Sequence, residues 1–244
     1  DWSSDVCSSD LTGFRKNPYA TKHNFAARVA FATGAFDIRY SGDYRGVFRR
    51  WDLVADAQIL MPRFVDNYFG LGNDAQMQDD VARSFNRVRS RRIFLFTGIK
   101  RQLNEYTQFA AGPFYLFNKT EQTEGRFIDF PSQITGLTAT DFESQQFAGL
   151  RTYFTVNKVD KKAMPTRGMN FSLEARYVKE LTGAEDQFVH LSGDWSMYFK
   201  LLDGMIFANR IGGGTNLGDY KFWQAQSLGG LSNLRGYRNQ RFAG

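Results

Sequence analysis

Hydrophobic and polar residues alternate with a period of two along much of this sequence. In residues 169–180 one face of the pattern is apolar, whereas Glu174 and Arg176 belong to the other face. Residues 189–201 repeat the pattern, and their polar face carries His190 and Asp194. Successive side chains of a β-strand point to opposite faces of a sheet. Each segment is therefore predicted to form a strand with one apolar and one polar face.

About nine strands are predicted in this way. Their ranges are 23–33, 35–46, 51–61, 86–101, 105–118, 146–157, 169–180, 189–201 and 204–212. Many have ~10 residues or more, which exceeds the ~5–6 of a soluble strand and matches the ~9–11 of a tilted membrane-spanning strand. Long connections, such as 61–85 and 118–145, alternate with tight ones, such as 101–106 and 201–204. This alternation favours an antiparallel transmembrane β-barrel over a soluble β-protein.

The composition agrees with a barrel without deciding the question. Aromatic residues make up 16% of the chain, with 24 Phe and 11 Tyr, and the mean hydropathy is −0.44. No stretch approaches the ~18 consecutive apolar residues of a membrane-spanning helix, which excludes a helical membrane protein. Barrel strands are only half apolar, so this pattern does not exclude them. A soluble all-β protein shares much of this composition.

The first eleven residues, DWSSDVCSSDL, do not resemble the rest. They lack the basic and apolar regions of a signal peptide, and they match the in-frame translation of a short-read sequencing adapter. We expect residues 1–11 to be an adapter artefact without ordered structure, and residues 12–244 to be part of a barrel domain cut at both ends. Without this segment the chain has no cysteine, and its formal net charge rises by three from +6.

Charged side chains recur on the polar faces of the predicted strands. They are Arg28, Asp37, Arg39, Asp52, Asp56, Arg151, Glu174, Arg176, His190, Asp194 and Lys200. A water-filled lumen accommodates such residues, whereas a closed soluble core would bury them at a high cost. In a soluble sandwich they would form the solvent-facing surface instead.

The sequence offers little catalytic or metal-binding chemistry. His190 and Asp194 share a face but lie ~13 Å apart along the strand, too far for an acid–base pair. Glu174 and Arg176 lie ~6.6 Å apart and are predicted to form an ion pair in the lumen. Two histidines cannot build a metal site alone, and no cofactor is expected.

A run of arginines, Arg87, Arg89, Arg91 and Arg92, could suggest nucleic acid binding. On alternate positions of a long strand, these residues are better explained by a lumen lining or by a rim that meets anionic lipid. No nucleic acid partner is therefore expected.

The segment SLGGLSNLRGYRNQRFAG at 227–244 is the most distinctive stretch, and it lacks the lysine and the strand-to-helix context of a phosphate-binding loop. Its motif residues are Gly229, Gly230, Leu234, Arg235, Gly236 and Tyr237. Here the chain resembles the BamA/TamA superfamily of outer-membrane assembly proteins, the bacterial surface antigen family. Members carry an Arg-Gly-aromatic motif in a long extracellular loop, after a Gly-Gly element.

Two further segments support the resemblance. The family has a Pro-x-Arg-Gly element three strands upstream, matched here by Pro165, Arg167 and Gly168 at a predicted strand start. We interpret this element as a turn that shapes the barrel. NYFGLGND at 67–74 is similar to a loop of Bacteroidetes-type members. The family barrel has sixteen strands, so this chain would hold about nine of them as an open, curved sheet, with 61–85 and 118–145 outside the cell.

The resemblance implies a non-enzymatic protein of the bacterial outer membrane that inserts or translocates other proteins. Its partners would be outer-membrane lipid and unfolded outer-membrane proteins. It also implies that Arg235 folds into the lumen and pairs with an acidic residue beyond the loop; otherwise Arg235 is a solvated loop arginine. The alternatives are a passive porin or transporter barrel, a barrel anchor fused to an upstream phosphoesterase or patatin-like domain, and a soluble β-rich binding module.

Overall fold

The computed structural model describes residues 2–13, 16–72, 82, 84–130, 135–183, 186–231 and 233–244. Ten long strands dominate it: β1 (Trp2–Gly13), β2 (Lys16–Ala30), β3 (Ala35–Phe48), β4 (Trp51–Asn67), β5 (Arg87–Gln102), β6 (Thr107–Glu121), β7 (Ser144–Val159), β8 (Gly168–Glu180), β9 (Gln187–Leu202) and β10 (Met205–Gly218). Single 3₁₀ turns, η1 (Phe127–Asp129), η2 (Ala139–Phe142) and η3 (Phe222–Gln224), lie in connections. Two short strands follow, β11 (Ser227–Leu228) and β12 (Phe242–Ala243).

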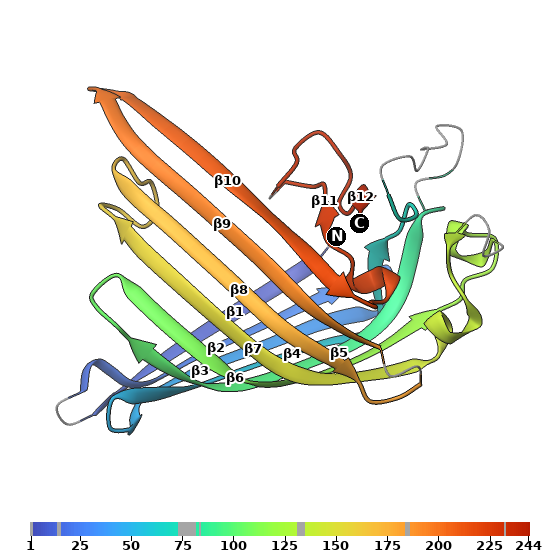
Figure 1. The fold of residues 1–244 in the computed structure, drawn as a ribbon, viewed down its shortest axis with the longest axis horizontal. Coiled ribbons are helices and arrows are strands. Elements are labelled where there is room, and N and C mark those ends of the chain that lie inside the picture. The colour runs from blue at the N-terminus through green and yellow to red at the C-terminus, as the bar shows by residue number, and fades with distance from the viewer. Residues whose placement is uncertain are drawn as a thin grey trace.

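The ten long strands form one antiparallel sheet in sequence order, from β1 at one edge to β10 at the other (Figure 1). The sheet is strongly curved, and β1 and β10 are not paired with each other, so the barrel is open. All nine predicted strands are found; most limits agree within a few residues, but β2 begins seven residues before its predicted start, and β4 and β10 end six residues after their predicted ends. The predicted all-β fold, an open and curved antiparallel sheet, is confirmed.

The first strand differs from the expectation for residues 1–11. The expected lack of order is not found over residues 2–11, because β1 pairs with β2 from Trp2↔Ala30 to Gly13↔Lys16. Backbone hydrogen bonds to a free sheet edge need no particular side chains, so a proline-free segment beside that edge can add a strand. Asp1 lies outside the described residues, and the adapter origin of the segment stays a prediction.

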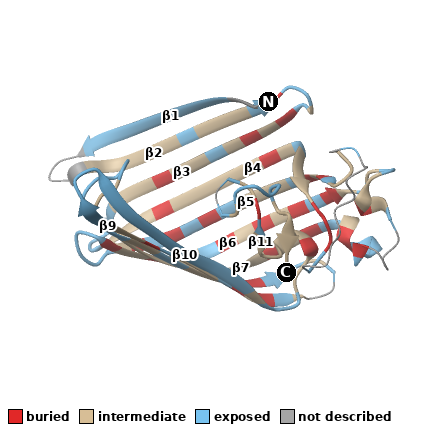
Figure 2. Cartoon of the chain, turned by 90° about the horizontal axis from the view of Figure 1, so that it is seen from above, coloured by how far each residue is buried: buried red, intermediate tan, exposed pale blue. Residues whose placement is uncertain are grey.

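The two faces of the sheet differ as the alternation predicts. On β8 the convex face presents the half-exposed side chains Met169, Leu173 and Tyr177, at 37%, 47% and 44% exposure. The concave face carries Glu174 and Arg176 from the same strand. Figure 2 shows buried residues concentrated on the central strands, whereas β10 is exposed along nearly its whole length. The described part of the chain contains no helix that is long and apolar enough to cross a membrane.

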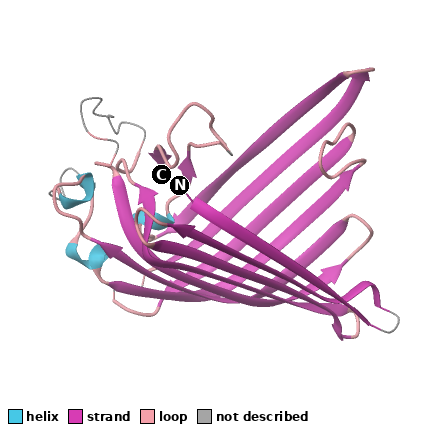
Figure 3. Cartoon of the chain, turned by 180° about the vertical axis from the view of Figure 1, so that it is seen from behind, coloured by secondary structure: helices cyan, strands magenta, loops and turns pink. Residues whose placement is uncertain are grey.

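The two longest connections between neighbouring strands lie at the same end of the sheet. The long connections between β4 and β5 and between β6 and β7 lie at one end, together with the segment that follows β10 (Figure 3). We call this the long-loop end. The connections β3–β4, β5–β6 and β9–β10 are tight and lie at the opposite, short-turn end. The alternation of connection lengths predicted this placement of the long connections, although the tight β2–β3 connection (31–34) lies at the long-loop end as well.

The concave face also carries an apolar cluster that the sequence analysis did not predict. Buried side chains of six strands, β4 to β9, meet there: Val54, Phe96, Ala110, Phe114, Leu116, Phe147, Val178 and Phe188. Tyr220 and Trp223, from the segment after β10, pack against them. The local signal is a loss of alternation in IFLF at 93–96 and FYLF at 114–117, because strands covered on both faces are apolar on both.

Candidate functional site: the concave face and the segment that crosses it

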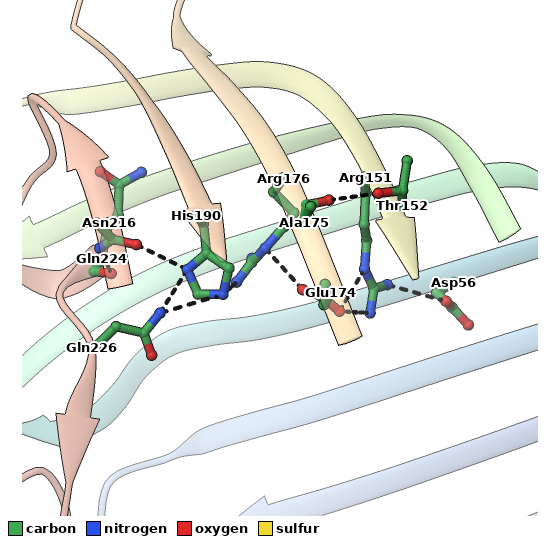
Figure 4. Close-up of polar contacts among 10 residues, drawn as sticks. All are labelled: Asp56, Arg151, Thr152, Glu174, Ala175, Arg176, His190, Asn216, Gln224 and Gln226. Atoms are coloured by element: carbon green, nitrogen blue, oxygen red, sulfur yellow. Dashed lines mark hydrogen bonds and ion pairs between the residues drawn. The ribbon is translucent and has the colours of Figure 1, made fainter. Parts of the chain in front are cut away.

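A row of polar side chains runs across four strands on the concave face (Figure 4). Strand register places Arg151 opposite Arg176, Arg176 opposite His190, and His190 opposite Asn216. Two arginines that face each other across neighbouring strands repel. Glu174 offsets that repulsion, because its carboxylate forms ion pairs with both.

The geometry around Glu174 is that of a shared ion pair. Its carboxylate lies 2.6 Å from Arg151 Nη2 and 2.9 Å from Arg176 Nε. Arg151 also approaches Asp56 on β4, with 3.7 Å between the nearest nitrogen and oxygen. The predicted Glu174–Arg176 ion pair is therefore found, and it belongs to a network that spans β4, β7 and β8.

His190 extends this network to the end of β10. Arg176 Nη2 lies 2.9 Å from His190 Nε2, and because a guanidinium only donates, Nε2 accepts. The tautomer with hydrogen on Nδ1 can then donate to Asn216 Oδ1 at 2.9 Å. Gln226 also reaches the ring, 2.7 Å from Nδ1. His190 thus joins the charged row to the segment after β10.

Asp194 lies apart from this row. Its carboxylate binds Arg210 of β10 at 2.6 Å and accepts a hydrogen bond from Ser196 of its own strand. Asp194 therefore belongs to a separate ion pair between β9 and β10. No group of three metal-ligating side chains is found among the described residues.

Removing the shared carboxylate should loosen the row. We expect Glu174→Gln to lower the free energy of unfolding by about 1–3 kcal/mol, because Arg151 and Arg176 then face each other without an anion between them. Urea titration of the protein in detergent measures this. The matched control is Asp194→Asn, whose partner Arg210 has a side chain 55% exposed, so that its loss should cost at most about 1 kcal/mol. Equal losses for the two variants would contradict the network.

The segment after β10, residues 219–244, folds back across the concave side near the long-loop end. Lys221 lies 2.8 Å from Asp186 and 3.6 Å from the buried carboxylate of Glu180. Trp223 Nε1 donates to Gln145 Oε1 at 2.9 Å, and its ring packs on Phe147. Charge and aromatic packing together therefore anchor the start of this segment.

The end of the segment is anchored on the other side of the open barrel. Gly72 N donates to Ala243 O at 2.7 Å, and Asn67 N donates to Gln240 Oε1 at 3.0 Å. Between the segment and the sheet lies an open cavity of about 910 Å³, whose lining includes Arg151, Glu174 and Arg210. The segment thus crosses from β9 to the end of β4 over a polar cavity.

The motif loop within this segment is a compact turn that depends on glycine. Gly229 has φ 136°, and a Cβ there would lie 2.1 Å from the carbonyl oxygen of Arg238. Gly230 N donates to Tyr237 O at 3.1 Å, and Gly230 also forms a bridge with the half-buried Leu234. Gly236 has φ 92°. Glycine at these positions therefore allows the backbone conformation that the turn requires.

Arg235 is exposed in the structure, and its Nε donates to the carbonyl of Leu231 at 3.4 Å. Tyr237 packs its ring against Phe242 instead of entering the cavity. The implied pairing of Arg235 with an acidic side chain stays a prediction. NYFGLGND at 67–74 lies partly outside the described residues, since only Asn67–Gly72 are described.

Pro165, Arg167 and Gly168 lie where the chain enters β8. Gly168 has φ 112°, and a Cβ there would lie 2.0 Å from Lys158 O. The organiser of this turn is Asp160, which the sequence analysis missed: its carboxylate accepts hydrogen bonds from Thr166 Oγ1 and from the backbone N–H groups of Lys161, Thr166 and Arg167. An aspartate before a run of loop residues is the available signal.

The hydrogen bonds from Thr166 and the neighbouring backbone hold the pKa of Asp160 well below its usual value. A depressed pKa contributes stability that is complete above the unfolded value of about 3.9 and is lost as the pH falls through the folded value. We therefore expect amide exchange at Thr166 and Arg167, corrected for intrinsic rates, to show constant protection from pH 5 to 7. Asp160→Asn should reduce this protection, with Asp203→Asn at another turn as the control. A fall in wild-type protection near pH 5 would contradict the assignment.

Comparison with known proteins identifies the family. The Omp85 superfamily domain matches residues 51–244. The chain belongs to the Omp85 superfamily. This confirms the resemblance to BamA/TamA proteins; the Bacteroidetes type stays a prediction.

Among solved structures, the chain is similar to the crystal structure of BamA from Haemophilus ducreyi lacking POTRA domains 1-3. The TM-score is 0.67 at 13% sequence identity, over 98% of this chain and 43% of that BamA chain. At this identity the likeness concerns the fold alone, and this Omp85 chain spans less than half of the BamA chain. A search of curated proteins found no match.

Proposed function

We propose that residues 12–244 are part of the barrel domain of a bacterial outer-membrane protein that inserts or translocates other proteins. The Omp85 match over residues 51–244 is the observation that carries this proposal. The glycine-dependent loop with Arg235, which ends a segment folded across the concave side, supports it. The convex face would contact outer-membrane lipid, and unfolded outer-membrane proteins would be the substrates. The proposed role is non-enzymatic and involves no nucleic acid.

A passive pore is the second candidate, because the cavity on the concave face is polar and open. Against it, the segment 219–244 lies across that face and is anchored on both sides of the open barrel. A segment held across that face would narrow the path of ions through the barrel. Ion flux and assembly activity therefore separate the two candidates.

The test uses the full protein that carries this chain, reconstituted into liposomes with a urea-unfolded barrel protein as substrate. Folding of the substrate is followed by its heat-modifiable migration on gels. We expect the protein to accelerate folding over empty liposomes, Arg235→Ala to reduce the acceleration, and Arg238→Ala, an exposed neighbour in the same segment, to leave it unchanged. Ion flux without any acceleration of folding would favour the passive pore.

A further inference from the structure

The convex face of β4–β6 carries a concentration of positive charge at the long-loop end. We call it the cationic patch; it comprises Arg63, Arg87, Arg89, Arg91, Lys119 and Arg126. On β5 the concave face is marked by the buried Val88 and Ser90, so the intervening arginines point to the convex face. Arg92 is not part of the patch, since it lines a cavity on the concave side.

Neighbouring strands extend this patch sideways. Register places Arg91 opposite Lys119, and Arg89 opposite Glu121. Arg63 of β4 also belongs to the patch, because it and Arg89 approach the same carboxylate. Arg63 Nε lies 3.5 Å from Glu121 Oε2, and Arg89 Nη1 lies 3.4 Å from Glu121 Oε1. Arg126 donates to the backbone carbonyl of Arg87 at 3.1 Å. Of the six cations, Arg63 and Arg89 form ion pairs in the described part of the chain, and both pair with Glu121.

The charge of the patch is not balanced from within. No ion pair is found among the described residues for Arg87, Arg91, Lys119 or Arg126. Burial, followed by the charges of Arg89 and Arg87, lowers the pKa of Arg126. Cations directly opposite each other in a sheet destabilise it. An external anion would remove this repulsion.

The position of the patch on the convex face indicates which kind of anion it would bind. Along the convex face of β5 the cations are followed by Ile93, Leu95 and Ile99, and the last two are 44% and 39% exposed. On β6, Phe117 and Tyr115 lie opposite Ile93 and Leu95. The patch therefore begins where the lipid-facing apolar band ends, at the depth of lipid headgroups.

We propose that the cationic patch binds the phosphate groups of anionic membrane lipids in the leaflet at the long-loop end. Guanidinium groups hold phosphate oxygens through paired, charge-assisted hydrogen bonds, and clustered basic residues beside an apolar span recognise anionic headgroups. The acyl chains of a lipid bound in this way would pack against the apolar band next to the patch. The inference rests on the proposed membrane location of the convex face, and not on the assembly activity.

Binding is measured on the full protein in detergent micelles, by native mass spectrometry with a phosphomonoester lipid, phosphatidic acid, and with phosphatidylcholine as the zwitterionic comparison. The test variant is Arg87→Gln/Arg91→Gln/Lys119→Gln, which leaves both ion pairs of Glu121 intact. The control is Arg49→Gln/Arg50→Gln/Lys158→Gln, which removes the same charge from exposed positions at the short-turn end. Heat-modifiable migration confirms that both variants are folded, and Arg91→Gln alone provides a milder variant.

We expect the test variant to bind phosphatidic acid about tenfold or more weakly than the unmodified protein, and the control to change by less than about twofold. Equal weakening by both variants would show that only net charge matters and would overturn the proposal. Complete displacement of the lipid by millimolar inorganic phosphate would overturn it as well, since the acyl chains would then contribute nothing. If lipid binding follows this pattern but substrate folding is not accelerated, the proposed function fails and the inference stands.

Discussion

Leu173→Arg is expected to destabilise the folded protein in lipid vesicles by about 2–4 kcal/mol. Leu173 lies near the middle of β8 on the convex face, and its side chain is 47% exposed. A cation placed at the midplane on the lipid-facing side of a barrel strand costs about this much, because hydrocarbon cannot solvate it. Urea unfolding of the vesicle-bound protein, followed by tryptophan fluorescence, measures the change.

The neighbouring residue provides the matched control. Ser172 points to the concave face, lines the 910 Å³ cavity and lies opposite Asp194 on β9. Ser172→Arg should change the free energy of unfolding by less than about 1 kcal/mol, because water in the cavity and the carboxylate of Asp194 can solvate the new cation. If Leu173→Arg is tolerated as well as Ser172→Arg, the convex face does not meet lipid, and the soluble β-protein becomes the better hypothesis.

Lys221→Met is expected to release the segment 219–244 from the concave side. Lys221 is the cation between Glu180, whose side chain is 3% exposed, and Asp186. Removing one partner of a buried ion pair typically costs about 3–5 kcal/mol, because the remaining charge stays buried without compensation. Hydrogen exchange at the amides of Gly72 and Gly244, which bond to Ala243 and Gln226, should accelerate by about 100-fold or more.

Arg238→Met is the control for this effect, because Arg238 is exposed in the same segment. Its substitution should leave exchange at Gly72 and Gly244 within about twofold of the unmodified protein. Unchanged exchange in Lys221→Met would show that aromatic packing of Trp223 alone anchors the segment. The ion pair would then have no part in closing the concave face.

The strands could be predicted because alternation with a period of two determines which side chains share a face. Glu174 and Arg176 were placed together on this ground alone, and their ion pair follows from their spacing. Their contacts with Arg151 and His190 depend on register between β7, β8 and β9. Register is set by pairing along whole strands, which the pattern within one strand does not contain.

The segment after β10 could not be placed from sequence for a different reason. Its contacts join residues far apart in the chain, such as Trp223 with Gln145 and Ala243 with Gly72. The sequence shows that the stretch is irregular and rich in glycine, but it does not show which strands the stretch packs against. Strand β1 was not predicted. It pairs with backbone groups at the free edge of β2, and this pairing does not require an alternating side-chain pattern.

We expect one face of this sheet to meet lipid and the other to meet water. The most direct test is a nitroxide scan of residues 169–177, after Cys7→Ser removes the only cysteine of the sequence. Single cysteines are labelled in the vesicle-bound protein, and collisions with oxygen and with a water-soluble nickel chelate are measured. We expect oxygen access at 169, 171, 173, 175 and 177, and nickel access at the residues between them. Nickel access on both faces would contradict this expectation.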